Sequence, residues 1–205
     1  MTTILRVDSS SRTTTSQSRA LGDYFEKTWH ARNPGARVVR RDLVTEPIPQ
    51  IADQTIVGYY TPTEQLTAEL RAATALSDRL IAELQSADIL LLTVPMYNFS
   101  IPSALKAWID QIVRIGRTFS YDGKNFSGLV KVKHAYVICA YGAEGYTGGG
   151  PFSTFNFLEP YLKSLLGFLG ISDIQFFAVQ ATTTDSAMVA ANMDIAKHQI
   201  VTAIA

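Results

Sequence analysis

The sequence predicts an α/β protein in which a five-stranded parallel sheet is covered by helices on both faces. Short apolar runs that favour strands alternate along the chain with longer runs whose apolar residues recur at helical spacing. The central apolar run is continuous rather than alternating, as expected of a strand buried on both faces. Five strands fit the order 2-1-3-4-5, in which a ligand binds beyond the first and third strands.

The composition is that of one globular domain spanning residues 1–205. Hydrophobic residues make up 47% and charged residues 18%, which supports a sizeable core. Lys plus Arg and Asp plus Glu each number 18, so the chain lacks the basic character that nucleic-acid binding needs. The single cysteine, Cys139, cannot form an internal disulfide, and neither a signal peptide nor a long apolar run is recognisable. We expect a cytoplasmic protein that binds neither nucleic acid nor membrane.

The N-terminal part is expected to hold two strands around one helix. Residues 4–8 form a short apolar run, and residues 37–43 form a second whose charges suit the edge of a sheet. Between them, apolar residues at three- and four-residue spacing predict a helix over residues 17–32. The Asn-Pro-Gly of residues 33–35 ends it.

The middle of the chain is expected to hold the central strand. Residues 45–63 contain three prolines and are expected to form a long irregular connector. Residues 64–85 follow as a long helix with one apolar face. Residues 88–94 are the apolar central strand, and residues 104–114 predict an amphipathic helix.

The C-terminal part begins with a short β excursion at residues 118–121, followed by an Asp-Gly turn. A buried strand is predicted at residues 134–140 and a fifth strand at residues 173–179, with an apolar helix over residues 152–168 between them and a last helix over residues 186–204. We expect the following aromatic residues to lie mostly in the core, with some facing a partner subunit: Trp108, Phe152, Phe155, Phe157 and Phe168.

A polar loop between the first strand and the first helix is the first candidate site. Residues 9–18 carry eight Ser or Thr in ten positions, and the following helix offers free N–H groups with partial positive charge. This pattern favours a bound phosphate, to which Arg12 could contribute. The alternative is a plain N-cap at Ser16. Neither a Gly-rich dinucleotide motif nor a Walker loop occurs, so the phosphate is expected to be that of a mononucleotide.

A second loop, residues 95–102, joins the central strand to its helix. A proline stiffens each end, and between them stand Met96, Tyr97, Asn98 and Phe99. A rigid, partly apolar loop with free N–H groups suits the edge of a flavin ring, with the N–H of Asn98 or Phe99 near N5 of the ring. The alternative is that Tyr97 and Phe99 only close the end of the sheet.

A glycine-rich loop follows the fourth strand, with five glycines in residues 142–150. Glycine permits close backbone approach to a ligand, so the loop is either a contact for the other edge of the ring or a flexible surface turn. No nucleophile elbow is present, and His30, His134 and His198 lack metal-ligand spacing. We therefore assign no metal and no catalytic side chain, and we expect Cys139 to be inert packing.

Several motifs of the chain occur together in one known family. They are residues 95–99 with Leu105-Lys106, Asp110, Gly116, Thr118-Phe119 and Tyr121; Ser9-Ser10 with Ser16-Gln17-Ser18; and residues 160–162 with 166–171. With these motifs the chain resembles, over nearly its whole length, the FMN-dependent NADH:azoreductases, which are flavodoxin-like quinone oxidoreductases. The resemblance implies a flavodoxin-like three-layer sandwich, bound FMN, and a homodimer with two active sites at the interface.

The resemblance also implies which residues bind. The cofactor contacts would be Ser10, Ser16, Gln17, Ser18, Pro95, Met96, Tyr97, Asn98, Phe99, Ala140, Tyr141, Gly142 and Ala143. The substrate contacts would be Asn98, Phe99, Phe119, Tyr121 and Tyr146, with Phe119 and Tyr121 reaching the partner's site. Residues 140–143 depart from the family's frequent Ser-Arg-Gly-Gly at three of four positions, and residues 144–146 lack a histidine that relatives often carry.

The expected reaction is a ping-pong cycle in which NADH or NADPH reduces the flavin by hydride transfer and a quinone or azo compound then reoxidises it. The protein orients the rings while the flavin carries the chemistry. Two alternatives stay open: a flavodoxin-type electron carrier, and an FMN-free hydrolase on the same fold. The balanced charge and long connector disfavour the carrier, and the missing nucleophile elbow disfavours the hydrolase.

Overall fold

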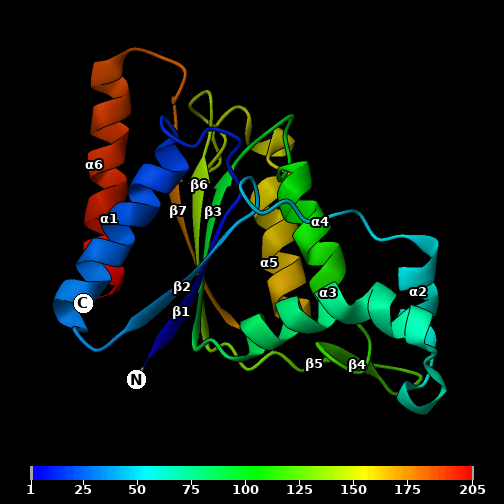
Figure 1. Ribbon diagram of the computed structural model, residues 1–205. Helices are drawn as coiled ribbons and strands as arrows, with labels where there is room; N and C mark the ends of the chain where they lie inside the picture. Colours follow the sequence, from blue (N-terminus) through cyan, green and yellow to red (C-terminus); the bar gives the residue numbers. More distant parts are fainter. Residues whose placement is uncertain (1, 205) are drawn as a thin grey trace.

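Figure 1 shows the computed structural model of the chain, which describes residues 2–204 as a three-layer α/β sandwich. Its main sheet has five parallel strands in the order β2-β1-β3-β6-β7. The strands are β1 (Thr3–Asp8), β2 (Arg37–Asp42), β3 (Ile89–Pro95), β6 (His134–Ala140) and β7 (Asp173–Val179). This is the predicted 2-1-3-4-5 order, so the predicted fold class is confirmed. The central β3 is buried at every residue, as its unbroken apolar sequence indicated.

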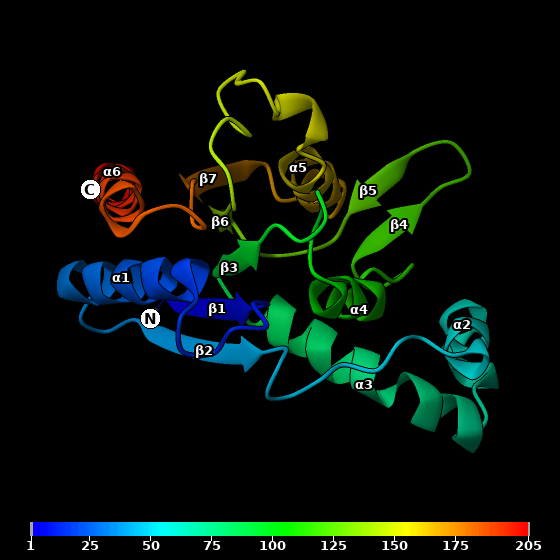
Figure 2. The same ribbon diagram turned by 90° about the horizontal axis from the view of Figure 1, so that it is seen from above.

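Helices cover both faces of this sheet (Figure 2). On one face, α1 (Gln17–Arg32) and α6 (Ser186–Ala203) enclose a core cluster. On the other face, α3 (Ala68–Gln85), α4 (Ser103–Ile112) and α5 (Leu158–Phe168) enclose a larger one. Cys139 lies fully buried in the larger cluster, and burial raises the pKa of its thiol well above the usual value, which agrees with a packing role.

The connector after β2 is less irregular than predicted. It contains α2 (Asp53–Tyr60) and a 3₁₀ turn, η1 (Thr63–Gln65), and the predicted helix from residue 64 starts only with α3. Thr67 sets that start, because its hydroxyl accepts a hydrogen bond from the Leu70 N–H at 3.2 Å. Gly58 lets α2 pack closely on α3, since a Cβ there would lie 2.6 Å from the Thr74 methyl group.

The helix predicted from residue 152 was also too long. Residues before Leu158 form turns and a 3₁₀ segment, η2 (Ser153–Phe155), and the Asn156 side chain accepts the N–H groups of Leu158 and Glu159 at the start of α5. The aromatic residues of this stretch are therefore exposed rather than in the core: Phe152 42%, Phe155 49% and Phe157 58%. Trp108 is buried as predicted, and Phe168 is half-buried.

The predicted β excursion is a hairpin of β4 (Phe119–Tyr121) and β5 (Phe126–Gly128) that lies beyond α4 and α5, away from α1 and α6 (Figure 2). It packs against the end of α5, where a Cβ on Gly128 would lie 2.1 Å from the backbone of Gly170. None of the helices formed by residues 2–204 has both the length and the apolar character needed to cross a bilayer.

Candidate active site

Loops from the carboxyl ends of four strands meet around a cavity of about 240 Å³. Because parallel strands place their carboxyl ends at one edge of the sheet, segments far apart in sequence come together there. The lining residues are Ser10, Arg12, Thr15, Ser16, Gln17, Pro95, Met96, Tyr97, Ala140, Gly142, Thr182 and Thr183. The structure thus brings together parts of all three loops that the sequence singled out.

The loop after β1 places hydroxyl groups and helix N–H groups at one end of the cavity. The Ser16 hydroxyl caps α1 by accepting the Arg19 N–H at 3.3 Å, and it lies 3.1 Å from the hydroxyl of the buried Ser18. Among residues 2–204, no acceptor is found for the N–H groups of Gln17 and Ser18. The capping role of Ser16 is therefore real, yet it leaves donors and the positive end of the helix dipole for an anion.

A largely buried network of charged side chains connects the loop after β1 to the sheet. The Arg19 guanidinium donates to both Asp42 carboxylate oxygens at 2.6 and 2.8 Å and to the Ser10 carbonyl at 2.9 Å. The hydrogen bonds from Arg19 lower the pKa of Asp42 to about 2. Asp8 accepts hydrogen bonds from Arg6 at 3.1 Å and from the Thr93 hydroxyl at 2.7 Å. The network therefore fixes the backbone of the loop relative to β1, β2 and β3.

The loop after β3 makes a tight two-residue turn. Tyr97 and Ser100 exchange backbone hydrogen bonds of 3.0 and 3.1 Å, and the central residues have positive φ, 47° at Asn98 and 72° at Phe99. Positive φ at both positions is the pattern of a type I′ turn, which Asn tolerates and Phe adopts at a cost. Among residues 2–204, no acceptor is found for the N–H groups of Asn98 and Phe99, so both can donate to a ligand.

Tyr97 ties the two loops together. Its hydroxyl accepts the Ser11 N–H at 3.1 Å. Partial burial acts to raise the pKa of Tyr97, but hydrogen bonds with Ser10 and Ser11 outweigh it, so the pKa lies below the ordinary value. The loop after β1 and the loop after β3 therefore form one connected wall of the cavity.

The third loop contributes less than the sequence suggested. Ala140 and Gly142 line the cavity, whereas Tyr141 is fully buried and its hydroxyl donates to Glu159 at 2.5 Å. Burial raises the pKa of Tyr141, so the phenol stays protonated. The backbone of Tyr141 is also occupied, because its N–H donates to the Val179 carbonyl at 2.8 Å and its carbonyl accepts hydrogen bonds from Thr182. Neither Tyr141 nor Ala143 lines the cavity.

Thr182 and Thr183 line the cavity but were not predicted. Their hydroxyls donate to the carbonyls of Tyr141 and Gly142, at 3.0 and 2.9 Å. The signal that could have found them is the one that marked residues 9–18: a cluster of hydroxyl residues, here 182–184, shortly after the end of a predicted strand.

The remaining candidates do not line this cavity in the single chain. Phe119 packs on Phe168 with ring centres 4.8 Å apart, and Tyr121 stacks on Phe126 at 4.6 Å, both at the distant hairpin. Tyr146 stacks on Tyr141 at 5.5 Å. Of the turn residues, Asn98 has its N–H free, and Phe99 lies exposed, 5.5 Å from Phe155 between ring centres.

The chain is similar in sequence to several curated proteins. The family model described as "Flavodoxin-like fold" matches residues 2–203. An FMN-dependent NADH:quinone oxidoreductase of Xanthobacter autotrophicus is 55% identical over 175 residues, which cover 85% of this chain and 84% of that protein. One from Nostoc punctiforme is 44% identical over 176 residues, which cover 86% of this chain and 85% of that protein.

Solved structures agree with these relatives. An FMN-dependent NADH-azoreductase of Bacillus anthracis in complex with FMN superposes with a TM-score of 0.86 at 25% identity, covering all of this chain and 98% of that one. A second azoreductase from Bacillus anthracis superposes with a TM-score of 0.89 at 24% identity, covering all of this chain and 99% of that one, which shows the shared fold. With the matching family model and the identity to the curated relatives, these findings show that the chain belongs to the flavodoxin-like fold family and, within it, to the FMN-dependent NADH:quinone oxidoreductases.

Proposed function

We propose that this protein binds FMN and uses NADH or NADPH to reduce quinones and azo compounds. The observation that carries the proposal is the single cavity at which the loops after β1, β3 and β6 converge. One end offers hydroxyls and free helix N–H groups, and the other offers Pro95, Met96 and Tyr97. The relatives that are named for this activity support the same conclusion over the electron carrier and the hydrolase.

The residues of the cavity fit FMN. Ser10, Ser16, Gln17 and Ser18 would hold the phosphate through hydroxyls and N–H groups. Met96 would support the ring, and the free N–H groups of Asn98 and Phe99 would donate to its polar edge. The chemistry that FMN supplies when bound is two-electron hydride transfer, from the nicotinamide and then to the acceptor in a ping-pong cycle. We assign no side chain as proton donor.

The first test is a visible spectrum of the protein after incubation with FMN and gel filtration, followed by anaerobic NADH and then a quinone. We expect retained flavin bands that bleach with NADH and return with quinone, without any partner protein. Flavin that is retained but not bleached would indicate a carrier, and a colourless protein would remove the proposal. Asn98→Gly keeps the positive-φ turn and should retain flavin, whereas Asn98→Ala strains the turn and should release it more readily.

We further propose that the protein is a cytoplasmic single-domain chain that forms a homodimer. A free, buried Cys139 suits a reducing compartment. Exposed apolar side chains lie on α2, on and next to the β4–β5 hairpin, and on the segment before α5, and such groups mark interaction surfaces. They are Ile56, Val57, Tyr60, Tyr121, Phe126, Leu129, Phe155 and Phe157.

The dimer is tested by measuring mass with light scattering at low micromolar concentration. We expect twice the chain mass for the wild type, and a shift toward the monomer for Tyr121→Glu, because a charge is introduced into an apolar contact. Ile195→Glu is the matched control, since Ile195 is 58% exposed on α6 on the opposite face. A monomeric wild type, or equal effects of both variants, would contradict the assignment.

A further inference from the structure

We propose that Gln180 is a positioning residue for the cofactor site, which holds the glycine-rich loop in place through its side-chain oxygen. The inference rests on the proposed function, because it concerns the same cavity. Gln180 follows directly on β7 and does not itself line the cavity. Its action would therefore be through the loop, not through contact with the cofactor.

Three consecutive backbone N–H groups converge on one atom. Gly145, Tyr146 and Thr147 all donate to Gln180 Oε1, at 3.0, 2.9 and 3.4 Å. Gly145 has φ of 93°, a left-handed conformation that glycine adopts without strain. Successive N–H groups aimed at one point form a concave nest that attracts a strong acceptor. In this protein the acceptor is a neutral amide oxygen from the neighbouring strand end.

The backbone of Gln180 is fixed by a hydrogen bond to its carbonyl and by the buried residue that follows it. Its carbonyl accepts the Asn192 side-chain N–H from α6 at 3.2 Å. The next residue, Ala181, is fully buried with φ of 58°, a left-handed conformation that costs energy in a residue with a Cβ. Backbone strain of this kind persists only where surrounding contacts enforce it, so the path of the chain here is strongly determined.

The strained bend directs the following residues back onto the same loop. The Thr182 N–H and hydroxyl both donate to the Tyr141 carbonyl, each at 3.0 Å, and the Thr183 N–H and hydroxyl donate to the Gly142 carbonyl at 3.1 and 2.9 Å. The start of the loop is thus held by the two threonines, and its middle by Gln180.

This arrangement offsets the flexibility of a loop with five glycines in residues 142–150. Glycine loses more conformational entropy on ordering than any other residue. Gly142 lines the cavity, and Tyr146 stacks on Tyr141 with planes 18° apart. A loop that is ordered before the ligand arrives binds more tightly, because the cost of ordering is already met.

The test compares two replacements of Gln180 in the full chain. Gln180→Met has similar length but no acceptor, and Gln180→Glu keeps an acceptor oxygen in the same place. Gln175→Met on β7 is the control, because among residues 2–204 the Gln175 side chain makes no hydrogen bond. Amide hydrogen exchange of residues 145–147 is measured without flavin, and FMN affinity is measured by quenching of flavin fluorescence. Thermal unfolding checks that each variant is folded.

We expect Gln180→Met to speed exchange at residues 145–147 and to weaken FMN binding, each by roughly tenfold, the size of about one net hydrogen bond. In Gln180→Glu and Gln175→Met, the exchange rate at residues 145–147 and the FMN affinity should both stay close to those of the wild type. Unchanged exchange in Gln180→Met, or faster exchange with unchanged FMN affinity, would overturn the inference. A wild-type protein that binds no FMN would instead overturn the proposed function and the cofactor role of Gln180, while the exchange data would still decide whether Gln180 holds the loop.

Discussion

Replacing Ser10 and Ser16 together with Ala is expected to weaken FMN binding by about a hundredfold or more, while riboflavin binding changes little. Both hydroxyls line the cavity at the start of α1. A hydrogen bond to a charged group contributes about 1.5–3 kcal/mol, and 1.4 kcal/mol is a factor of ten in affinity. Riboflavin lacks the phosphate, so it does not use these donors. Quenching of flavin fluorescence gives both affinities from one preparation.

The double variant also removes the cap of α1, which costs about 1 kcal/mol of stability. Thr67→Ala is the matched control, because Thr67 caps α3 in the same way and does not line the cavity. We expect this control to lower the melting temperature but to leave FMN affinity unchanged. If riboflavin and FMN lost affinity equally, the serine loop would not be the phosphate site.

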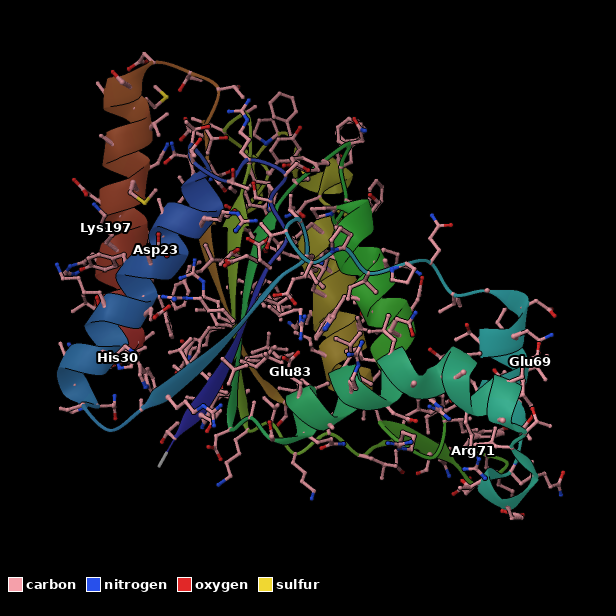
Figure 3. The ribbon with its side chains drawn as sticks, viewed as in Figure 1. Asp23, His30, Glu69, Arg71, Glu83 and Lys197 are labelled. Atoms are coloured by element: carbon pink, nitrogen blue, oxygen red, sulfur yellow. The ribbon has the colours of Figure 1, made fainter. Side chains whose placement is uncertain are left out.

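Replacing Arg6 with Met is expected to destabilise the protein by about 3–5 kcal/mol, the cost of leaving a buried charge without its partner. The Arg6 side chain is 3% exposed and pairs with Asp8, Asp23 and Glu26 at 3.1, 2.7 and 3.2 Å. Burial acts to lower the pKa of Arg6, but the carboxylates of Asp8 and Asp23 outweigh it and raise the pKa. Asp23 lies on α1 (Figure 3). Its carboxylate accepts a hydrogen bond from Arg6 at 2.7 Å, so the guanidinium joins this helix to the sheet.

Thermal unfolding measures this prediction. For a domain of this size, the loss corresponds to a melting temperature lower by roughly 10 °C. Arg40→Met is the control, because Arg40 is 60% exposed and its pair with Glu26 is expected to contribute less than about 1 kcal/mol. Equal effects of the two replacements would show that the buried network does not carry the stability. One cooperative transition in the wild type would agree with a single domain, and two would contradict it.

Local sequence patterns determined more of the loop after β1 than of the loop after β6. The cap at Ser16 needs only a hydroxyl residue directly before the first residue of a helix, and its bond to the Arg19 N–H spans three positions of the sequence. It was therefore recognisable without any tertiary contact. The start of α5 was missed because Phe152 and Phe155 continue the apolar pattern, although the helix begins only at Leu158, whose N–H donates to the Asn156 side chain. The glycines of residues 142–150 indicated either close backbone contact with a ligand or a flexible turn. They did not indicate that the Gln180 side chain would hold the loop.

The sequence by itself determined the strands, most of the helices, the order of the sheet and the two loops that face each other across its first and third strands. Hydrophobic periodicity, which is read over short stretches of sequence, decides the strands and helices. The rules for connecting successive elements decide the order of the sheet. Only the tertiary structure decided which side chains meet across these loops. Arg19 reaches Asp42 and the Ser10 carbonyl because β1 and β2 are paired in register. Thr183 reaches Gly142 because β6 and β7 end together. A polar side chain needs a partner where it is buried, and strand pairing decides which residue is close enough to be that partner.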